Sequence, residues 1–199
     1  RDVVEFSIKE IPDTKDVVEI AKSTEELTNK DVVVTITKKA DEEYTELKIE
    51  TSTDNETYKE ETENIITKTL KENGTIYVRV VKEDIIGEIV EVKVENIDKT
   101  APTVTTTYTT TELTKENVMA TITVNENIQQ VSGWTLSSDG LKLTKTYSEN
   151  TAETGEKVTI KDLVGNETKA TIKITNIDKK APTAKVTYST TNPTNKDDL

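Results

Sequence analysis

Apolar and polar side chains alternate along much of the chain. In the segment 118–124, Val, Ala, Ile and Val alternate with Met, Thr and Thr, and the segment 32–36 repeats the pattern with two valines and an isoleucine. A period of two places successive side chains on opposite faces, so each segment is predicted to be a β-strand with one buried face in an antiparallel sheet. No long segment shows a helical period, although 56–66 is compatible with a helical turn.

Glycine-containing pairs mark turns between the alternating segments. Asp139-Gly140 lies between two apolar stretches, and Asn73-Gly74 precedes the alternating run 76–80. Both pairs suit the positive φ of a two-residue hairpin, so we expect a hairpin at each. Strands in short succession without intervening helices are typical of a sandwich or a barrel, and about seven strands per repeat favours a sandwich. The sequence therefore predicts an all-β fold.

An internal repeat is the most informative feature of the sequence. The segment 96–103, NIDKTAPT, returns as 176–183, NIDKKAPT, at a spacing of 80 residues. A more diverged copy precedes it, because 27–32 matches 113–118, 67–73 matches 144–150, and DIIG at 84–87 matches DLVG at 162–165. The spacing drifts between these matches, which indicates insertions and deletions in loops. Recurrence at a fixed period predicts an array of similar units.

The matched segments define domain boundaries. We predict two complete repeats, 12–97 and 98–177. Residues 1–11 align with the last strand of a preceding repeat, and residues 178–199 align with the first strand of a following one. Pro102 and Pro182 mark the junctions, where proline denies a sheet its hydrogen-bond donor and ends the pairing.

Composition excludes several kinds of chemistry. The chain has no cysteine and no histidine, which removes disulfides, thiolate metal sites, cysteine nucleophiles and the commonest general base. Acidic residues alternate with apolar ones in the strands, which favours a solvated face over a catalytic carboxylate pair, so we expect no enzyme. The formal net charge of −12 would repel phosphate backbones and anionic lipid. Neither nucleic-acid binding nor direct membrane binding is expected.

Calcium is the one metal for which the sequence offers candidates. Asp98 and Asp178 lie at the repeat junctions, and Asp162 and Asn166 lie in the turn before the last strand of the second repeat. Oxygen ligands from a junction and a neighbouring loop are the kind that Ca²⁺ prefers. The alternative is that these side chains cap their own turns, because Asp and Asn readily bond the backbone two residues on.

Trp134 is the only tryptophan, in the segment Gly133-Trp134-Thr135-Leu136. Sandwiches often bury a tryptophan in the core, whereas an exposed tryptophan could stack on a sugar. Ile49 stands at the matching position of the earlier repeat, so core packing is the favoured interpretation.

The order of motifs at the end of the second repeat resembles a known family. The turn 162–166, DLVGN, is followed by the strand 170–175, by Asn-Ile-Asp at 176–178 and by Ala-Pro-Thr at 181–183. This order is similar to that of the bacterial immunoglobulin-like repeats of Gram-positive cell-surface proteins. The resemblance covers nearly the whole chain, although Glu88 replaces the turn Asn and Asp16 replaces the proline in the first copy. It implies tandem immunoglobulin-like β-sandwich domains in an extracellular protein of the cell surface or cell wall.

The expected function is that of a structural spacer or stalk, which projects a functional head from the wall. Its expected partners are neighbouring immunoglobulin-like repeats of the same chain. Three alternatives stay open: an adhesin module that binds a host protein or glycan, an accessory region of a large surface carbohydrate-active enzyme, and a subunit of an extracellular filament or surface layer.

Overall fold

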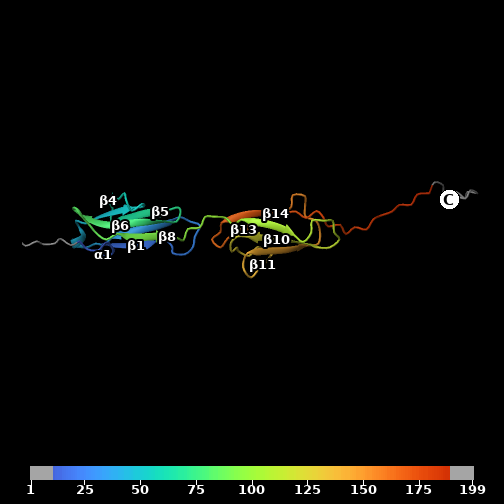
Figure 1. Cartoon of the computed structure of the whole chain (residues 1–199), viewed down its shortest axis with the longest axis horizontal. Coiled ribbons are helices and arrows are strands. Elements are labelled where there is room, and N and C mark those ends of the chain that lie inside the picture. The colour runs from blue at the N-terminus through green and yellow to red at the C-terminus, as the bar shows by residue number, and fades with distance from the viewer. Residues whose placement is uncertain (1–10, 189–199) are drawn as a thin grey trace, which may run out of the picture. The chain divides into compact units, whose positions relative to one another are not determined.

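A computed structural model describes residues 11–188 of the 199-residue chain, and its fold is nearly all β (Figure 1). The prediction of an all-β protein is therefore confirmed. The strands are β1 (Val18–Lys22), β2 (Val32–Lys38), β3 (Lys48–Ser52), β4 (Lys59–Glu61), β5 (Ile65–Leu70), β6 (Gly74–Lys82), β7 (Ile85–Ile86), β8 (Val90–Val94), β9 (Val104–Tyr108), β10 (Val118–Val124), β11 (Thr135–Leu136), β12 (Lys142–Tyr147), β13 (Glu156–Lys161) and β14 (Glu167–Ile172).

Helical structure in the described residues is limited to two single turns, α1 (Thr14–Val17) and the 3-10 turn η1 (Glu42–Tyr44). The segment 56–66, for which a helical turn was an alternative, instead contains β4 and the start of β5. No helix within residues 11–188 is long and apolar enough to cross a membrane.

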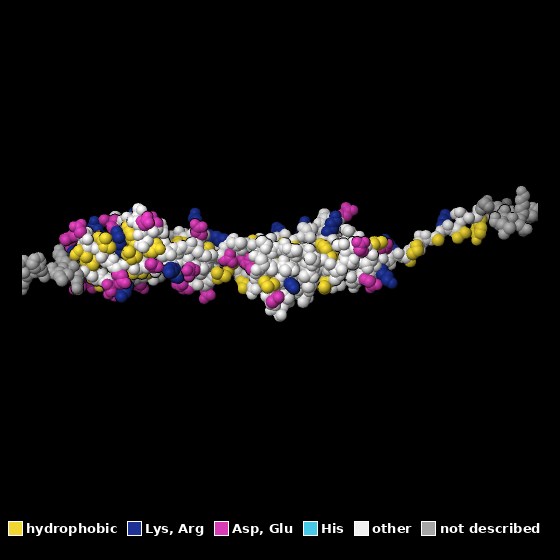
Figure 2. Space-filling model, in the orientation of Figure 1, with side chains coloured by type: hydrophobic (Ala, Val, Ile, Leu, Met, Phe, Trp, Pro, Cys, Tyr) yellow, Lys and Arg dark blue, Asp and Glu magenta, His cyan; other side chains and the backbone are white. Residues whose placement is uncertain are grey.

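The chain divides into two compact units. The first unit comprises residues 11–103 together with the short segments 126–129 and 160–168, and the second comprises 104–125, 130–159 and 169–188. Figure 2 shows acidic side chains at many places on one face of the first unit, with basic and hydrophobic side chains between them.

The first unit contains two antiparallel sheets. The smaller has the order β1-β2-β5, and the larger has the path β4-β3-β6-β7, with β8 paired to β6. The apolar faces of both sheets meet in one buried cluster, to which the smaller sheet contributes Val18, Val32, Val34, Ile36 and Ile66 and the larger contributes Ile49, Ile76, Val78, Val80, Val92 and Val94. Each such side chain contributes about 1.5–3 kcal/mol when it is fully buried, so this shared core is the main source of stability of the unit.

The other two sheets contain the strands β9 to β14. One has the order β11-β12-β10-β9, and the other pairs β13 with β14. In β10 the predicted alternation is confirmed, because the four small or branched apolar residues are buried while Met119 is 37% exposed. Buried side chains from the remaining strands include Leu143 and Tyr147 of β12, Val158 and Ile160 of β13, and Ala170 and Ile172 of β14.

Of the two predicted hairpins, one is confirmed. Strand β11 pairs antiparallel with β12, and Gly140 in the connection between them has a φ of +71°. The Ser137 hydroxyl and the Leu141 N–H both donate to the Asp139 carboxylate, and the Lys142 N–H donates to the Ser137 hydroxyl, as expected for a tight turn with short polar side chains.

The hairpin expected at Asn73-Gly74 is wrong. Strand β5 pairs with β2, whereas β6, which begins at Gly74, pairs with β3 and β8. The segment between them therefore connects two different sheets and needs no two-residue reversal. Gly74 does not have a positive φ, and the side chain of Asn73 donates a hydrogen bond to the distant Ile97 carbonyl.

That bond belongs to a group of contacts that we call the first clasp, formed by Thr28, Asn73, Asn96 and Ile97. Thr28 and Ile97 form an isolated parallel bridge, in which the Thr28 N–H donates to the Asn96 carbonyl at 2.9 Å. The side chain of Asn73 donates to the Ile97 carbonyl at 3.0 Å and accepts from the Ile97 N–H at 2.8 Å. The clasp thus joins the end of the first predicted repeat to two of its own loops.

The second clasp, formed by Thr114, Asn150, Asn176 and Ile177, repeats these contacts. Thr114 and Ile177 form a parallel bridge, and the Thr114 N–H donates to the Asn176 carbonyl at 2.8 Å. The side chain of Asn150 donates to the Ile177 carbonyl at 2.9 Å and accepts from the Ile177 N–H at 2.8 Å. The residues of the second clasp are the ones that the repeat in the sequence aligns with those of the first clasp.

The first Asn of each junction makes a further matching contact. The side-chain amide of Asn96 donates to the carbonyls of residues 24 and 26 at 3.2 and 2.8 Å. The amide of Asn176 donates to the carbonyls of residues 110 and 112 at the same two distances. The recurrence of the motif NID in the sequence therefore has a direct physical basis, because its Asn and its Ile fasten the junction to the preceding loops.

Strands of neighbouring repeats were predicted at both ends of the chain. The last strand of a preceding repeat, expected at 1–11, lies almost wholly outside the described residues, as does the part of the expected following repeat beyond residue 188. Within the described part, 178–188 contains no strand, and Val186 and Tyr188 are 73% and 79% exposed. A strand needs a neighbour to accept its hydrogen bonds, and 184–188 has none among the described residues.

Candidate functional site

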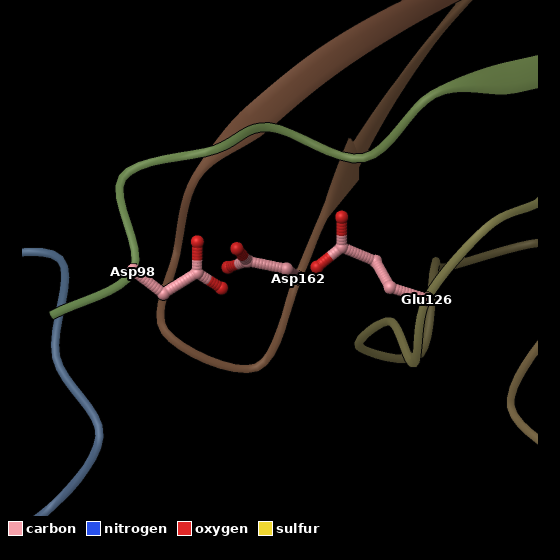
Figure 3. A group of neighbouring side chains, drawn as sticks. All are labelled: Asp98, Glu126 and Asp162. Carbon is pink, nitrogen blue, oxygen red and sulfur yellow. The ribbon is translucent and has the colours of Figure 1, made fainter. Parts of the chain in front are cut away.

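Three carboxylates converge in the first unit. One oxygen from each of Asp98, Glu126 and Asp162 lies within 4.8 Å of the other two. Figure 3 shows the three side chains pointing toward one another from three separate segments. Asp98 follows the first clasp, Glu126 follows β10 and Asp162 follows β13. We call this group the acidic cluster.

Asp162 is the structural centre of the cluster. Its side chain is 98% buried, being only 2% exposed, and one carboxylate oxygen accepts the N–H groups of Val164, Gly165 and Asn166 at 3.0, 2.6 and 2.8 Å. The other oxygen accepts the side-chain amide of Asn166 at 2.7 Å. Gly165 has a φ of +97°, which an L side chain rarely adopts. Asp162 therefore holds the turn 162–166 in shape.

Asp98 is joined to that turn through its backbone. The side-chain amide of Asn166 donates to the Asp98 carbonyl at 2.9 Å, while the Asp98 N–H donates to the Thr28 carbonyl at 2.8 Å. The Asp98 carboxylate accepts the N–H of Thr100 at 3.0 Å, so it also caps its own turn. The structure thus brings together three of the four predicted ligands, Asp98, Asp162 and Asn166.

Glu126 is the member of the cluster that the sequence did not indicate. It is half-buried, and its burial raises the pKa of its carboxyl group above the usual value, with a further increase from the charges of Asp98 and Asp162. The repeat comparison gave no signal for this residue. At the spacing of 86 that matches the neighbouring segments, the earlier repeat has Ala40 in its place.

Asp178, the fourth predicted ligand, lies apart from the cluster in the second unit. It is exposed, and its carboxylate accepts the N–H of Lys180 at 3.0 Å, which is the same turn-capping contact that Asp98 makes with Thr100. The described residues supply Asp178 with no counterpart of Glu126 or Asp162. Asp178 as a calcium ligand therefore stays a prediction.

The geometry of the acidic cluster permits two ways to relieve the repulsion of its charges. A cavity of about 190 Å³ beside it is lined by Leu27, Asn127 and Leu163 as well as by the three carboxylates. A hard cation could take oxygens from the cluster, although Ca²⁺ prefers six to eight oxygen ligands and two carboxylates here already accept backbone N–H groups. Alternatively, Glu126 can hold a proton. Calcium binding stays a prediction.

A second polar cluster surrounds Glu156 at the start of β13. Lys145 approaches its two carboxylate oxygens at 2.8 Å each, and the Tyr147 hydroxyl donates to it at 2.9 Å. Burial raises the pKa of Glu156, but the hydrogen bonds from Lys145, Tyr147 and Trp134 outweigh it, and the pKa falls below its usual value. Burial and the bond to Glu156 raise the pKa of Tyr147. Every charge in this group is paired, which indicates a structural role.

The first unit has a related ion pair at the matching lysine. Lys68 lies 77 residues before Lys145, the spacing of the surrounding sequence match, and its ammonium group bonds Glu61 at 2.5 Å. The carboxylate comes from β4 here and from β13 in the other case. Thr51 also donates to Glu61 at 2.6 Å. The lysine position therefore recurs, while its partner is supplied by a different strand.

The interpretation of Trp134 as a core residue is confirmed. Its side chain is 6% exposed, and Lys145 lies 5.9 Å from the centre of its ring. The residue precedes β11 rather than lying within a strand. Its indole N–H reaches Glu156, which satisfies the one polar group of a buried tryptophan.

Comparison with known proteins does not assign a family. No protein-family model matches the chain, and no curated protein has a significant match to it.

Proposed function

We propose that this chain is a spacer built from tandem immunoglobulin-like β-sandwich repeats in a bacterial cell-surface protein. The architecture of the first unit supports the proposal, because two antiparallel sheets bury their apolar faces in a common core. The absence of histidine and cysteine from the whole sequence also favours a mechanical role over a chemical one. Repeats that interact only with their neighbours extend in one dimension as they are added.

The observation that carries the proposal is the duplicated clasp. In each clasp a parallel bridge and an asparagine side chain hold the isoleucine at the equivalent position, which is Ile97 in the first clasp and Ile177 in the second. Tension applied along the chain would have to break the backbone bonds and the two asparagine bonds together before the junction could separate from its repeat. Several hydrogen bonds loaded in parallel resist more force than the same bonds broken one after another.

The burial of Trp134 favours a spacer over the adhesin alternative. An exposed tryptophan would offer a flat apolar surface to a sugar or to a protein, but this one is enclosed and bonded to Glu156. The charges of the cluster around Glu156 are paired within the chain, and Asp162 of the acidic cluster is used to hold its own turn, which favours structural roles for both carboxylates. The alternatives of an enzyme accessory region and a filament subunit gain no specific observation.

The experiment that tests the proposal measures length. Small-angle X-ray scattering is recorded from the 199-residue chain and from a longer chain, in which residues 1–183 continue into an added copy of residues 104–199. We expect the maximum dimension to increase by at least about 30 Å, the length of a nine-residue strand such as β6 at ~3.3 Å per residue. An increase no larger than that of a compact sphere gaining the same mass would contradict the spacer function.

A further inference from the structure

The first unit contains a contact between a turn and a surface that we call the first docking surface, formed by Leu27 and Asp98. The turn is 162–166, whose residue Asn166 donates its side-chain amide to the Asp98 carbonyl at 2.9 Å. Leu27 and the apolar residues Leu163 and Val164 of the turn line the same cavity of about 190 Å³. The docking surface thus offers the turn an apolar side chain and a backbone acceptor.

The second unit contains the same surface. Leu113 corresponds to Leu27 because each precedes the threonine of its clasp, and Asp178 corresponds to Asp98 because each follows the isoleucine. The backbone N–H of Asp178 donates to the Thr114 carbonyl at 2.8 Å, as that of Asp98 does to Thr28. The clasps hold these residues in equivalent positions. Leu113 and Asp178 therefore form a second docking surface.

The two docking surfaces differ in what covers them. Pro102 is buried and Asp98 half-buried, whereas Pro182 and Asp178 are exposed. The exposed fraction of the leucine rises from 56% at Leu27 to 75% at Leu113. A groove of about 610 Å³ lies at the second surface, lined in part by Leu113, Ile177 and Asp178. The second surface is thus built like the first and is left open by the described residues.

We propose that the second docking surface binds the Asp-x-x-Gly-Asn turn of a further repeat of the same kind. This inference rests on the proposed spacer function and adds to it the residues that join one repeat to the next. The Asp178 carbonyl accepts the side-chain amide of the turn Asn, and Leu113 covers the two apolar residues between the turn Asp and the Gly. On the matching first surface, the structure holds a turn of this kind, 162–166.

The chemistry also defines which turns are excluded. The matching turn of the first repeat, 84–88, ends in Glu88 instead of an asparagine. A carboxylate at neutral pH has no N–H to donate and would face a carbonyl oxygen. A turn that ends in glutamate lacks the hydrogen bond that Asn166 makes. The surface therefore selects repeats with asparagine at the last position of the turn. An interface of this kind joins unlike ends and can be continued from repeat to repeat.

The test uses the longer chain described above, in which the added copy supplies the turn. Because the chain has no cysteine, a pair of thiols can be introduced without interference. One variant combines Leu113→Cys with Leu163→Cys in the added copy. The control combines Leu113→Cys with Asp139→Cys in the added copy, which lies in the β11–β12 connection outside the turn. The fraction of disulfide in a glutathione buffer gives the effective concentration of each pair.

We expect an effective concentration at least tenfold higher for the turn pair than for the control pair. Changing Asn166 of the added copy to Asp should lower the value for the turn pair by removing the amide donor. The pair Leu27→Cys and Leu163→Cys in the 199-residue chain calibrates the contact on which the proposal is based, and we expect it to match the turn pair within about threefold.

Equal effective concentrations for the turn pair and the control pair would overturn the docking proposal. The proposal would also be overturned if the pair Leu27→Cys and Leu163→Cys formed a disulfide no more readily than the control pair. The contact between the turn 162–166 and the first docking surface would then be missing. The scattering experiment on the same longer chain keeps this outcome separate from the spacer function. A full gain in length without preferred cross-linking leaves the spacer in place and removes the docking surface.

Discussion

The side-chain amide of Asn150 bonds both the N–H and the C=O of Ile177, at 2.8 and 2.9 Å. The substitution Asn150→Asp preserves the shape of the side chain, but it removes the N–H donor and places a carboxylate against the Ile177 carbonyl. We expect the free energy of unfolding of the second unit to fall by about 1–3 kcal/mol, the cost of leaving a polar group unpaired. Urea denaturation followed by the fluorescence of the single tryptophan measures the change.

Asn117→Asp is the matched control for that substitution. Asn117 is an exposed asparagine whose side-chain oxygen accepts from Lys179 at 2.8 Å. A carboxylate at this position keeps the acceptor and adds a charge opposite to that of the lysine, so stability should change by less than about 0.5 kcal/mol. Equal losses for the two variants would show that the second clasp contributes nothing specific.

Trp134 should anchor the core of the second unit. Trp134→Ala is expected to lower the free energy of unfolding by about 3–5 kcal/mol, because it removes a large buried side chain and leaves a cavity. Met119→Ala, on the exposed face of β10, is expected to cost less than about 1 kcal/mol. Circular dichroism during thermal unfolding compares the two variants, and a similar loss for both would contradict the assignment of Trp134 to the core.

Glu126 should make the stability of the first unit depend on pH. Burial, and then Asp98 and Asp162, raise the pKa of Glu126 in the folded protein above that in the unfolded chain. The folded state then retains a proton that the unfolded state has lost, so the stability that protonation supplies is complete below the unfolded pKa. It disappears as the pH rises through the folded pKa. Glu126→Gln, which stays neutral, should remove this loss.

The measurement compares chemical unfolding of the wild type and Glu126→Gln from about pH 4 to pH 7 in metal-free buffer. The variant should gain stability relative to the wild type as the pH rises. Glu95→Gln, a change at an exposed residue directly after β8, should leave the pH profile of the wild type unaltered. A constant difference between the wild type and Glu126→Gln would refute the repulsion. If added Ca²⁺ then stabilises the wild type but not Glu126→Gln, the acidic cluster binds the cation.

Two glycines allow steric and backbone effects to be separated. Gly155 and Gly133 have φ values of +71° and +77°, so alanine is strained by a similar amount at both. A Cβ at residue 155 would lie 2.8 Å from the Ile172 carbonyl oxygen, whereas a Cβ at residue 133 would meet nothing within 4 Å.

Gly155→Ala should therefore be more destabilising than Gly133→Ala by about 1–3 kcal/mol, the usual cost of forcing an extra methyl group into a packed site. Thermal melts of the two variants give the comparison. The close approach of Gly155 to β14 would be disproved if both glycines tolerated alanine equally.

Alternation in the sequence was enough to predict strands such as β2 and β10 and their buried faces. Val118 to Val124 follow the period of two without exception, and the exposed position of Met119 agrees with it. Local turn chemistry was less reliable, because it cannot indicate which strands will pair. Asn73-Gly74 has the composition of a hairpin, but β5 and β6 belong to different sheets, and Asn73 is used for a clasp.

The candidate site was predicted only in part, because the sequence does not show which segments will meet in the fold. Asp98, Asp162 and Asn166 belong to recurring motifs, and the structure brings them together through a hydrogen bond to a backbone carbonyl. Glu126 belongs to no motif, since the other repeat has Ala40 in its place, and it joins the cluster only because β10 ends there. Asp178 shares the motif of Asp98 but lacks the surroundings. Recurrence identifies a turn, while a cluster also needs neighbours that a single sequence does not reveal.

The asparagine contacts of the clasps have a consequence for how such a protein can change in length. Each clasp fastens a junction to loops that precede it within the same eighty or so residues, so its bonds are complete without any later part of the chain. A gene rearrangement that deletes or duplicates one whole period would leave every remaining clasp with all its partners. Natural variants that differ by whole periods should therefore fold as well as one another.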